Sequence, residues 1–185
     1  MRANRRPVGW GRKNGSSMVE LCLIFLPLFA IFLGVIDFSV VIFLRGMYQA
    51  AVREGVRYAI TYNTTYDGAA CGTHTQCIQR VVQANTLGFL NGATGASYIK
   101  VNFYSPENLA TPLTPAALPL TLSNGNVVRY LNQTGNVVEV RIDNFPWNWM
   151  TPLAGFWPGH GVTISATAAD VLQGYPVGQF APPTP

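Results

Sequence analysis

Two carboxylates lie beside or within a long apolar run near the amino terminus. Glu20 directly precedes the run, and Asp37 and Cys22 are the only ionisable residues from Leu21 to Leu44. An isolated carboxylate inside a bilayer costs at least about 2.5–3.5 kcal/mol, so such groups usually have a partner. Glu20 fits either an inter-chain ion pair or a first-turn acid favoured by the helix dipole. Asp37 fits either a pair with another protein or a protonated side chain bonded within its own helix.

Two cysteines and a histidine form a second cluster. Cys71, His74 and Cys77 are each separated by two residues. Three ligands without an evident fourth make a poor zinc site, whereas a disulfide between Cys71 and Cys77 would close a small loop in an oxidising compartment. The disulfide is the favoured interpretation, with a metal site or a reduced pair as alternatives.

Residues suited to catalysis are scarce. The two histidines, His74 and His160, do not adjoin a nucleophile motif, and no phosphate-binding glycine loop is present. The sequence therefore predicts neither an enzyme nor a cofactor. Clustered indoles at Trp147, Trp149 and Trp157 could instead form a surface for binding a ligand such as a carbohydrate, or pack over a sheet as core.

The apolar run must position the two carboxylates. Its 24 residues, Leu21 to Leu44, would extend about 36 Å as a helix, enough to cross a hydrocarbon core of about 30 Å. No small-residue secretory cleavage motif closes the run. Five basic residues precede it and Arg45 alone follows at once, which favours a cytoplasmic amino terminus and an exported remainder.

Charge is divided unevenly along the chain. Residues 1–15 hold five positive charges and no negative one, whereas residues 16–185 hold seven basic and eight acidic residues. The basic character thus belongs to the leader. Because nucleic-acid binding requires basic residues clustered on a folded face, we expect no nucleic-acid partner.

The helix is expected to continue beyond the membrane. Residues 45–60 lack proline, and Arg53 and Arg57 are four residues apart and share a helix face with Glu54 beside them. These three residues fit a subunit contact or an ordinary solvated surface. Glycines 46 and 55 either permit close packing or mark a bend.

The remaining residues predict a small α+β domain. A helix is expected over residues 75–90, ending at Asn91-Gly92. Strands are expected over residues 97–104, 126–131, 136–143 and 161–171, with a hairpin loop at 132–135. About four strands would form an antiparallel sheet backed by helix. The predicted organisation is a leader (1–15), a transmembrane and extended helix (16–61), and an exported domain (62–185).

Several stretches together resemble one family. They are the Gly15-to-Glu20 segment at the start of the span, Leu26-Pro27, Gly34-Val-Ile-Asp-Phe38, the patch from Ala50 to Ala59, and a closing Val-Thr-Ile-Ser-Ala-Thr-Ala strand. The combination resembles the TadE-like family, pseudopilins of the tight adherence (Flp) pilus. The distinctive part is confined to about residues 15–60.

The resemblance implies a processing step and an assembly. A prepilin peptidase would cut between Gly15 and Ser16 on the cytoplasmic side. Glu20 would become the fifth residue of the mature chain, and its carboxylate would pair with the freed amino group of a neighbouring subunit. Asp37, or the helix face of Arg53, Glu54 and Arg57, would contact other pilins, pseudopilins or inner-membrane platform proteins.

The sequence therefore predicts a structural pseudopilin of a Tad/Flp pilus biogenesis and secretion system. It would cross the bacterial inner membrane once, with its carboxy-terminal domain in the periplasm. The alternative is a permanently anchored extracytoplasmic module that binds a ligand through its tryptophan-rich surface.

Overall fold

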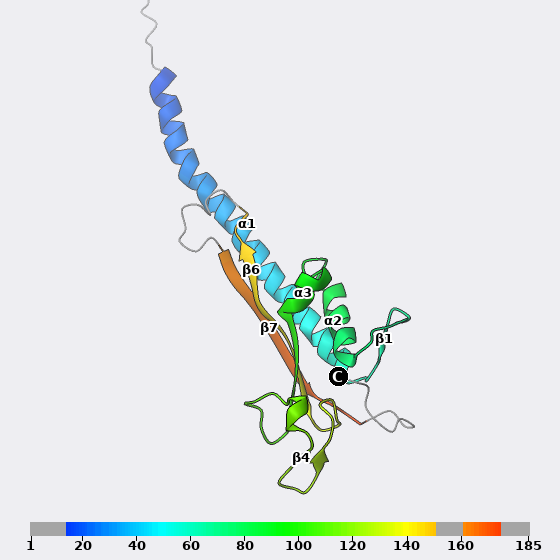
Figure 1. Ribbon diagram of the computed structural model, residues 1–185. Helices are drawn as coiled ribbons and strands as arrows, with labels where there is room; N and C mark the ends of the chain where they lie inside the picture. Colours follow the sequence, from blue (N-terminus) through cyan, green and yellow to red (C-terminus); the bar gives the residue numbers. More distant parts are fainter. Residues whose placement is uncertain (1–13, 151–160, 175–185) are drawn as a thin grey trace, which may run out of the picture.

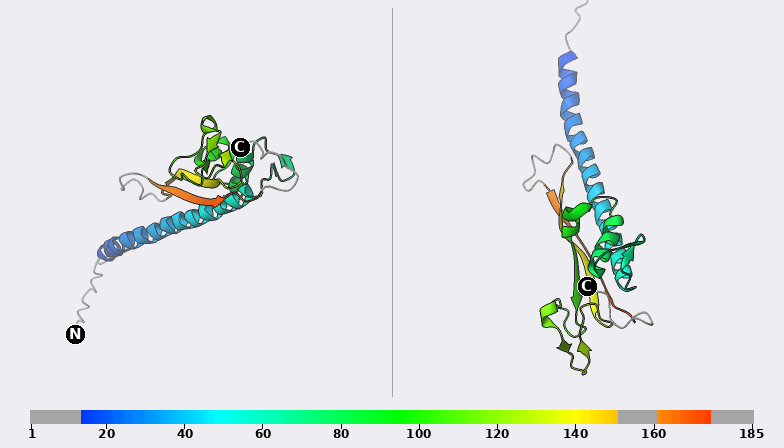
Figure 2. Two further views of the ribbon diagram at one scale, coloured as in Figure 1. Left: turned by 90° about the horizontal axis from the view of Figure 1, so that it is seen from below. Right: turned by 45° about the vertical axis from the view of Figure 1, so that its right-hand side comes forward.

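The computed structural model describes residues 14–150 and 161–174 of the 185-residue chain, with side chains from residue 17 onward. One long helix runs along the molecule, and the main sheet and the shorter helices lie beside its second half (Figure 1). The first half of the helix projects beyond the other elements of the described chain (Figures 1 and 2).

The helix α1 (Asn14–Ala59) confirms the continuous helix expected over residues 16–61. Pro27 lies inside it without ending it. Residues 17–59 form a helix long and apolar enough to cross a membrane. Its most apolar stretch has no buried residue, whereas Leu44, Tyr48 and Val52 are fully buried against the rest of the chain.

A three-stranded antiparallel sheet packs on the second half of α1. Its order is β3 (Ile99–Tyr104), β6 (Val137–Asn148), β7 (Gly161–Val171). The alternating pattern of each strand places one apolar face toward the helix, and the core includes Ile99, Val140 and Ile164. The opposite face is polar, and there the Tyr104 hydroxyl donates to Glu139 at 2.7 Å.

Smaller elements complete the fold. Helix α2 (His74–Ala84) packs beside the end of α1, and α3 (Gly92–Tyr98) leads into β3. Two short ladders lie outside the main sheet and are formed by β1 (Thr65–Tyr66) with β2 (Ala69–Ala70), and by β4 (Leu120–Thr121) with β5 (Val127–Val128). A single 3-10 turn, η1 (Pro115–Ala117), precedes β4. The α+β class is confirmed.

The helix expected over residues 75–90 is shorter than predicted. It ends at Ala84, where side chains compete for the last carbonyl groups. Asn85 donates to Val81 O at 2.9 Å, and Thr86 donates to Gln83 O at 2.7 Å. The expected start of the next strand, residues 97–98, belongs to α3 instead.

The hairpin expected between residues 126–131 and 136–143 was wrong. β5 pairs with β4, and β6 pairs with β3 and β7. The connecting segment is held as a loop because the buried Asn136 amide donates to the carbonyls of Tyr130 and Leu131 at 3.2 and 2.9 Å. These side-chain bonds replace the ladder bonds of a hairpin.

The two glycines in the second half of α1 have different surroundings. A Cβ atom at Gly55 would lie 2.6 Å from Val82 Cγ2, whereas a Cβ at Gly46 would meet nothing within 4 Å. Gly55 therefore permits the close approach of α2 to α1. Of the two roles that the sequence allowed for Gly55, close packing or a bend, the structure shows close packing.

Gly55→Ala should destabilise the fold. Val82 is β-branched and has little rotamer freedom, so the extra methyl group overpacks the contact and should cost about 1–3 kcal/mol of unfolding free energy. Gly46→Ala is the matched control and should raise stability by up to about 1 kcal/mol through helix propensity. Denaturant unfolding of the full chain in detergent measures both. Equal effects of the two substitutions would contradict the packing assigned to Gly55.

Candidate functional site

The residues expected at the processing site lie at the start of the long helix. α1 begins at Asn14, so Gly15 and Ser16 fall within its first turn. The first N–H groups of a helix lack the backbone bonds that stabilise its interior, and helix ends fray. This end of α1 is therefore the part of the helix that opens most easily.

Glu20 is exposed on the projecting half of α1. No hydrogen bond or ion pair joins it to another residue within the part of the chain that the structure describes. The carboxylate lies about 26 Å along the helix from Asp37, from 17 residues at about 1.5 Å each, so the two do not form one site.

Asp37 is buried, with only 5% of its surface exposed, although it lies within the apolar run. Its Oδ1 accepts a hydrogen bond from the backbone N–H of Met150 at 3.2 Å. Asp37 thus already has a partner in its own chain, just past the end of β6. Sequence reasoning missed this contact because no local pattern links residues 113 positions apart.

The three charged residues near the end of α1 lie together. Arg53, Glu54 and Arg57 are all exposed, and none forms an ion pair with another described residue. They flank the buried Val52 and Val56 of the same helix. Glu54 also lines a hollow between α1, β1 and α2, together with Thr65 and Asn85.

The predicted disulfide is confirmed. Cys71 and Cys77 are joined with an S–S distance of 2.07 Å. Thr73 caps α2 by accepting a hydrogen bond from Gln76 N at 3.2 Å. The disulfide therefore ties the segment before α2 to the first turn of that helix. Cys22 is free and exposed on α1.

His74 is fully buried between the cysteines. Its ring stacks on Tyr62 with a centroid distance of 6.0 Å. Neither ring nitrogen makes a well-formed hydrogen bond to a described residue. Burial lowers the pKa of His74 to about 4, and the Ala59 carbonyl offsets this only partly. His74 is therefore a neutral core residue at pH 7.

Two of the three tryptophans expected on a binding surface are half-buried. Trp147 packs against the core and meets Phe89 edge-on at 6.1 Å. Trp149 lies 5.5 Å from Phe38 of α1, measured between ring centroids. Trp157 lies outside the described residues. The placement of Trp147 and Trp149 favours the packing interpretation over a flat ligand platform.

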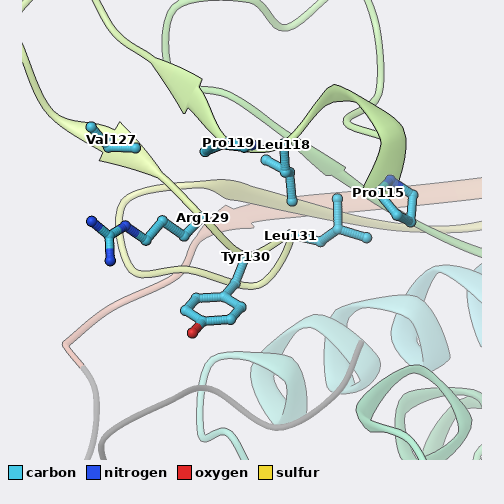
Figure 3. A pocket seen from close by; sticks show the side chains of 7 residues that line it. All are labelled: Pro115, Leu118, Pro119, Val127, Arg129, Tyr130 and Leu131. Carbon is cyan, nitrogen blue, oxygen red and sulfur yellow. The ribbon is translucent and has the colours of Figure 1, made fainter.

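A hollow of about 630 Å³ lies at the opposite end of the domain from the projecting helix. Leu118 and Leu131 point toward each other across it (Figure 3). Arg129 is its one charged lining residue, and the expected site residues do not line it. The hollow brings together no nucleophile and base. Across residues 14–150 and 161–174, no three His, Cys, Asp or Glu side chains are grouped to hold a metal ion.

One comparison with known proteins gives a match. Residues 15–57 match the family model described as TadE-like protein, which confirms the resemblance over this segment. The matched segment is α1 almost from end to end and contains Gly15, Ser16, Glu20, Asp37, Arg53, Glu54 and Arg57. No curated protein and no solved structure matches the chain.

His74 should make stability depend on pH. Its ordinary pKa of 6.5 is lowered to about 4 in the folded chain. Between these pH values the unfolded chain binds a proton at His74 that the folded chain does not bind. The contribution of neutral His74 to the free energy of unfolding is therefore full above pH 6.5 and is lost as the pH falls to 4. The loss should reach about 3 kcal/mol.

His74→Phe keeps an aromatic ring on Tyr62 and removes the titration. Denaturant unfolding of both chains between pH 4 and 7 should therefore show a steeper acid loss in the unsubstituted chain. Parallel pH profiles for the two chains would show that His74 does not cause the loss.

Proposed function

We propose that this chain, whose residues 15–57 match the TadE-like family, is a pseudopilin of a Tad/Flp pilus biogenesis and secretion system. The observation that carries the proposal is the division of α1. Its first half has almost no contact with the rest of its own chain, and its second half is the spine of a folded domain. A subunit that inserts one helix among others needs both properties.

Processing would change the charge at the start of this helix. A prepilin peptidase would cut between Gly15 and Ser16 and remove Arg2, Arg5, Arg6, Arg12 and Lys13. The new amino terminus would carry one positive charge at Ser16, four residues before Glu20. The position of the cut within the first turn of α1 supports the proposal, because the first backbone N–H groups of a helix have no intrahelical partner and this backbone opens most easily to a peptidase.

Glu20 would then pair with the amino group of a neighbouring subunit. In a bilayer the isolated carboxylate costs at least about 2.5–3.5 kcal/mol, and a charge-assisted bond to an amine offsets this cost. The lack of any partner for Glu20 among the described residues supports a partner from another chain. Asp37 would have a role within its own chain, because its carboxylate accepts a hydrogen bond from the backbone N–H of Met150.

The surface formed by Arg53, Glu54 and Arg57 would provide a second contact outside the membrane. Its charges are exposed and adjacent, so a neighbouring pilin, pseudopilin or inner-membrane platform protein of complementary charge could bind there. The domain would lie in the periplasm and the leader in the cytoplasm, as the basic residues before the span favour. We place the protein in initiation or completion of assembly, because a bulk Flp subunit is expected to be much shorter.

The rival function, an anchored ligand-binding module, has weaker support. It relied on exposed indoles, yet Trp147 and Trp149 pack against Phe89 and Phe38. Their contribution is structural.

Gly15→Ala should block processing. A peptidase that requires glycine before the cut should leave a precursor longer by the 15 residues of the leader, seen by gel electrophoresis of membranes from cells that carry the peptidase. Gly34→Ala is the control, since a Cβ there meets nothing within 4 Å, and it should be processed normally. A product of mature size from Gly15→Ala would remove the cleavage proposal.

A further inference from the structure

The depth of α1 in a bilayer can be read from where the carboxy-terminal domain meets it. Among the described residues, the domain reaches along α1 as far as Asp37, which accepts the N–H of Met150 at 3.2 Å. One residue further along, Phe38 meets the ring of Trp149. The end of β6 therefore lies level with residues 37 and 38 of α1, as the strands running beside the helix show in Figures 1 and 2.

This end of the sheet is unsuited to hydrocarbon. β3 pairs with β6 only as far as Ile142, so residues 145–148 of β6 pair on one side, with β7. Asn148 and Thr163 are exposed there. Open strand edges do not occur in the hydrocarbon region, because each unsatisfied backbone group costs several kcal/mol. The hydrocarbon must therefore end before the level of Asp37.

The helix that remains has the length of a membrane span. Residues 17–36 comprise 20 residues, which extend about 30 Å and equal the thickness of a typical hydrocarbon core. The charged residue among them, Glu20, lies at the cytoplasmic end under the proposed orientation. The sequence-based span, Leu21 to Leu44, would instead bury the sheet end together with Asp37.

We propose that the domain rests on the membrane surface through the end of β6, and that the bond between Asp37 and Met150 holds the end of β6 at this level of α1. The partner is the headgroup layer of the bilayer, where the amphipathic ring of Trp149 is favoured beside Phe38. The membrane span is then residues 17–36. Ile42, which is 71% exposed, lies in water about 9 Å beyond the hydrocarbon. This proposal concerns the bilayer alone and does not depend on the pilus assignment.

Depth-dependent quenching tests the span. The full chain with Cys22→Ala receives single cysteines at the exposed positions Leu28, Val35 or Ile42, each carrying an environment-sensitive fluorophore. The native pair, Cys71 and Cys77, is oxidised and does not react. In liposomes with a nitroxide at the bilayer centre, the label at 28 should lose most intensity, the label at 35 less, and the label at 42 none.

The competing span predicts a different profile. If residues 21–44 were embedded, the quenching maximum would shift about 9 Å toward the carboxy terminus. The label at 35 would then be quenched more than that at 28, and the label at 42 would also lose intensity. Either result would overturn the proposal.

A second arm tests contact between β6 and the headgroups. A label at Asn148→Cys should be quenched by a nitroxide on the lipid headgroup and not by one at the bilayer centre. A label at the exposed Ala116→Cys of η1, at the other end of the domain, should be quenched by neither lipid. If headgroup quenching at 148 were no greater than at 116, the surface contact would be refuted.

Asp37→Ala then tests the tether in the Asn148→Cys background. It should reduce headgroup quenching at 148. In a separate chain that combines Asp37→Ala with Leu28→Cys, quenching at 28 should be unchanged, because the apolar residues 17–36 still span the hydrocarbon. Ser39→Ala is the matched control, because the Ser39 hydroxyl bonds only Val35 O of its own helix among the contacts described, and it should keep the quenching at 148. Full quenching at 148 in Asp37→Ala would show that Asp37 does not hold the end of β6 at the headgroups.

Discussion

The close packing of the second half of α1 on the sheet is the contact on which the rest of the structure depends. It requires buried, mostly compact side chains along one face of the helix, including Ala51, Val52 and Gly55. The strands supply the matching apolar face with Val140 and Ile164. Among the described residues this packing begins near Asp37, so the helix has two environments: the apolar side chains before that point are largely exposed, whereas after it one face, including Leu44 and Tyr48, is buried and the other, including Ile42, stays exposed.

Charge follows the same division. The basic residues of the leader precede the apolar half of α1, and Arg53, Glu54 and Arg57 lie on its far, solvated half. Of the two carboxylates in the apolar run and at its start, Asp37 is satisfied within the chain and Glu20 is not. We therefore propose separate tasks for the two acids: Asp37 docks the domain on its helix, and Glu20 pairs with another chain.

Local patterns predicted α1, the strands β3, β6 and β7, and the disulfide, because periodicity, apolar length and close cysteine spacing are local signals. Contacts between segments far apart in the sequence could not be predicted, because no local pattern encodes them. The bond from Asp37 to Met150 joins residues 113 positions apart. β5 pairs with β4 rather than β6, and the side chain of Asn136 bonds the loop between β5 and β6. From the apolar composition around it, Asp37 was expected to lie within the membrane span. The hydrogen bond from Met150, just past the end of β6, shows that the carboxy-terminal domain contacts Asp37.

In the proposed role, α1 is a pilin-like assembly helix whose amino terminus is created by cleavage. Mass spectrometry of the amino terminus of the chain, purified from membranes of the cells that make it, tests this most directly. We expect a mature chain that begins at Ser16, with Glu20 as its fifth residue. A mature chain that still carries the leader, or one cut after the apolar run, would contradict it.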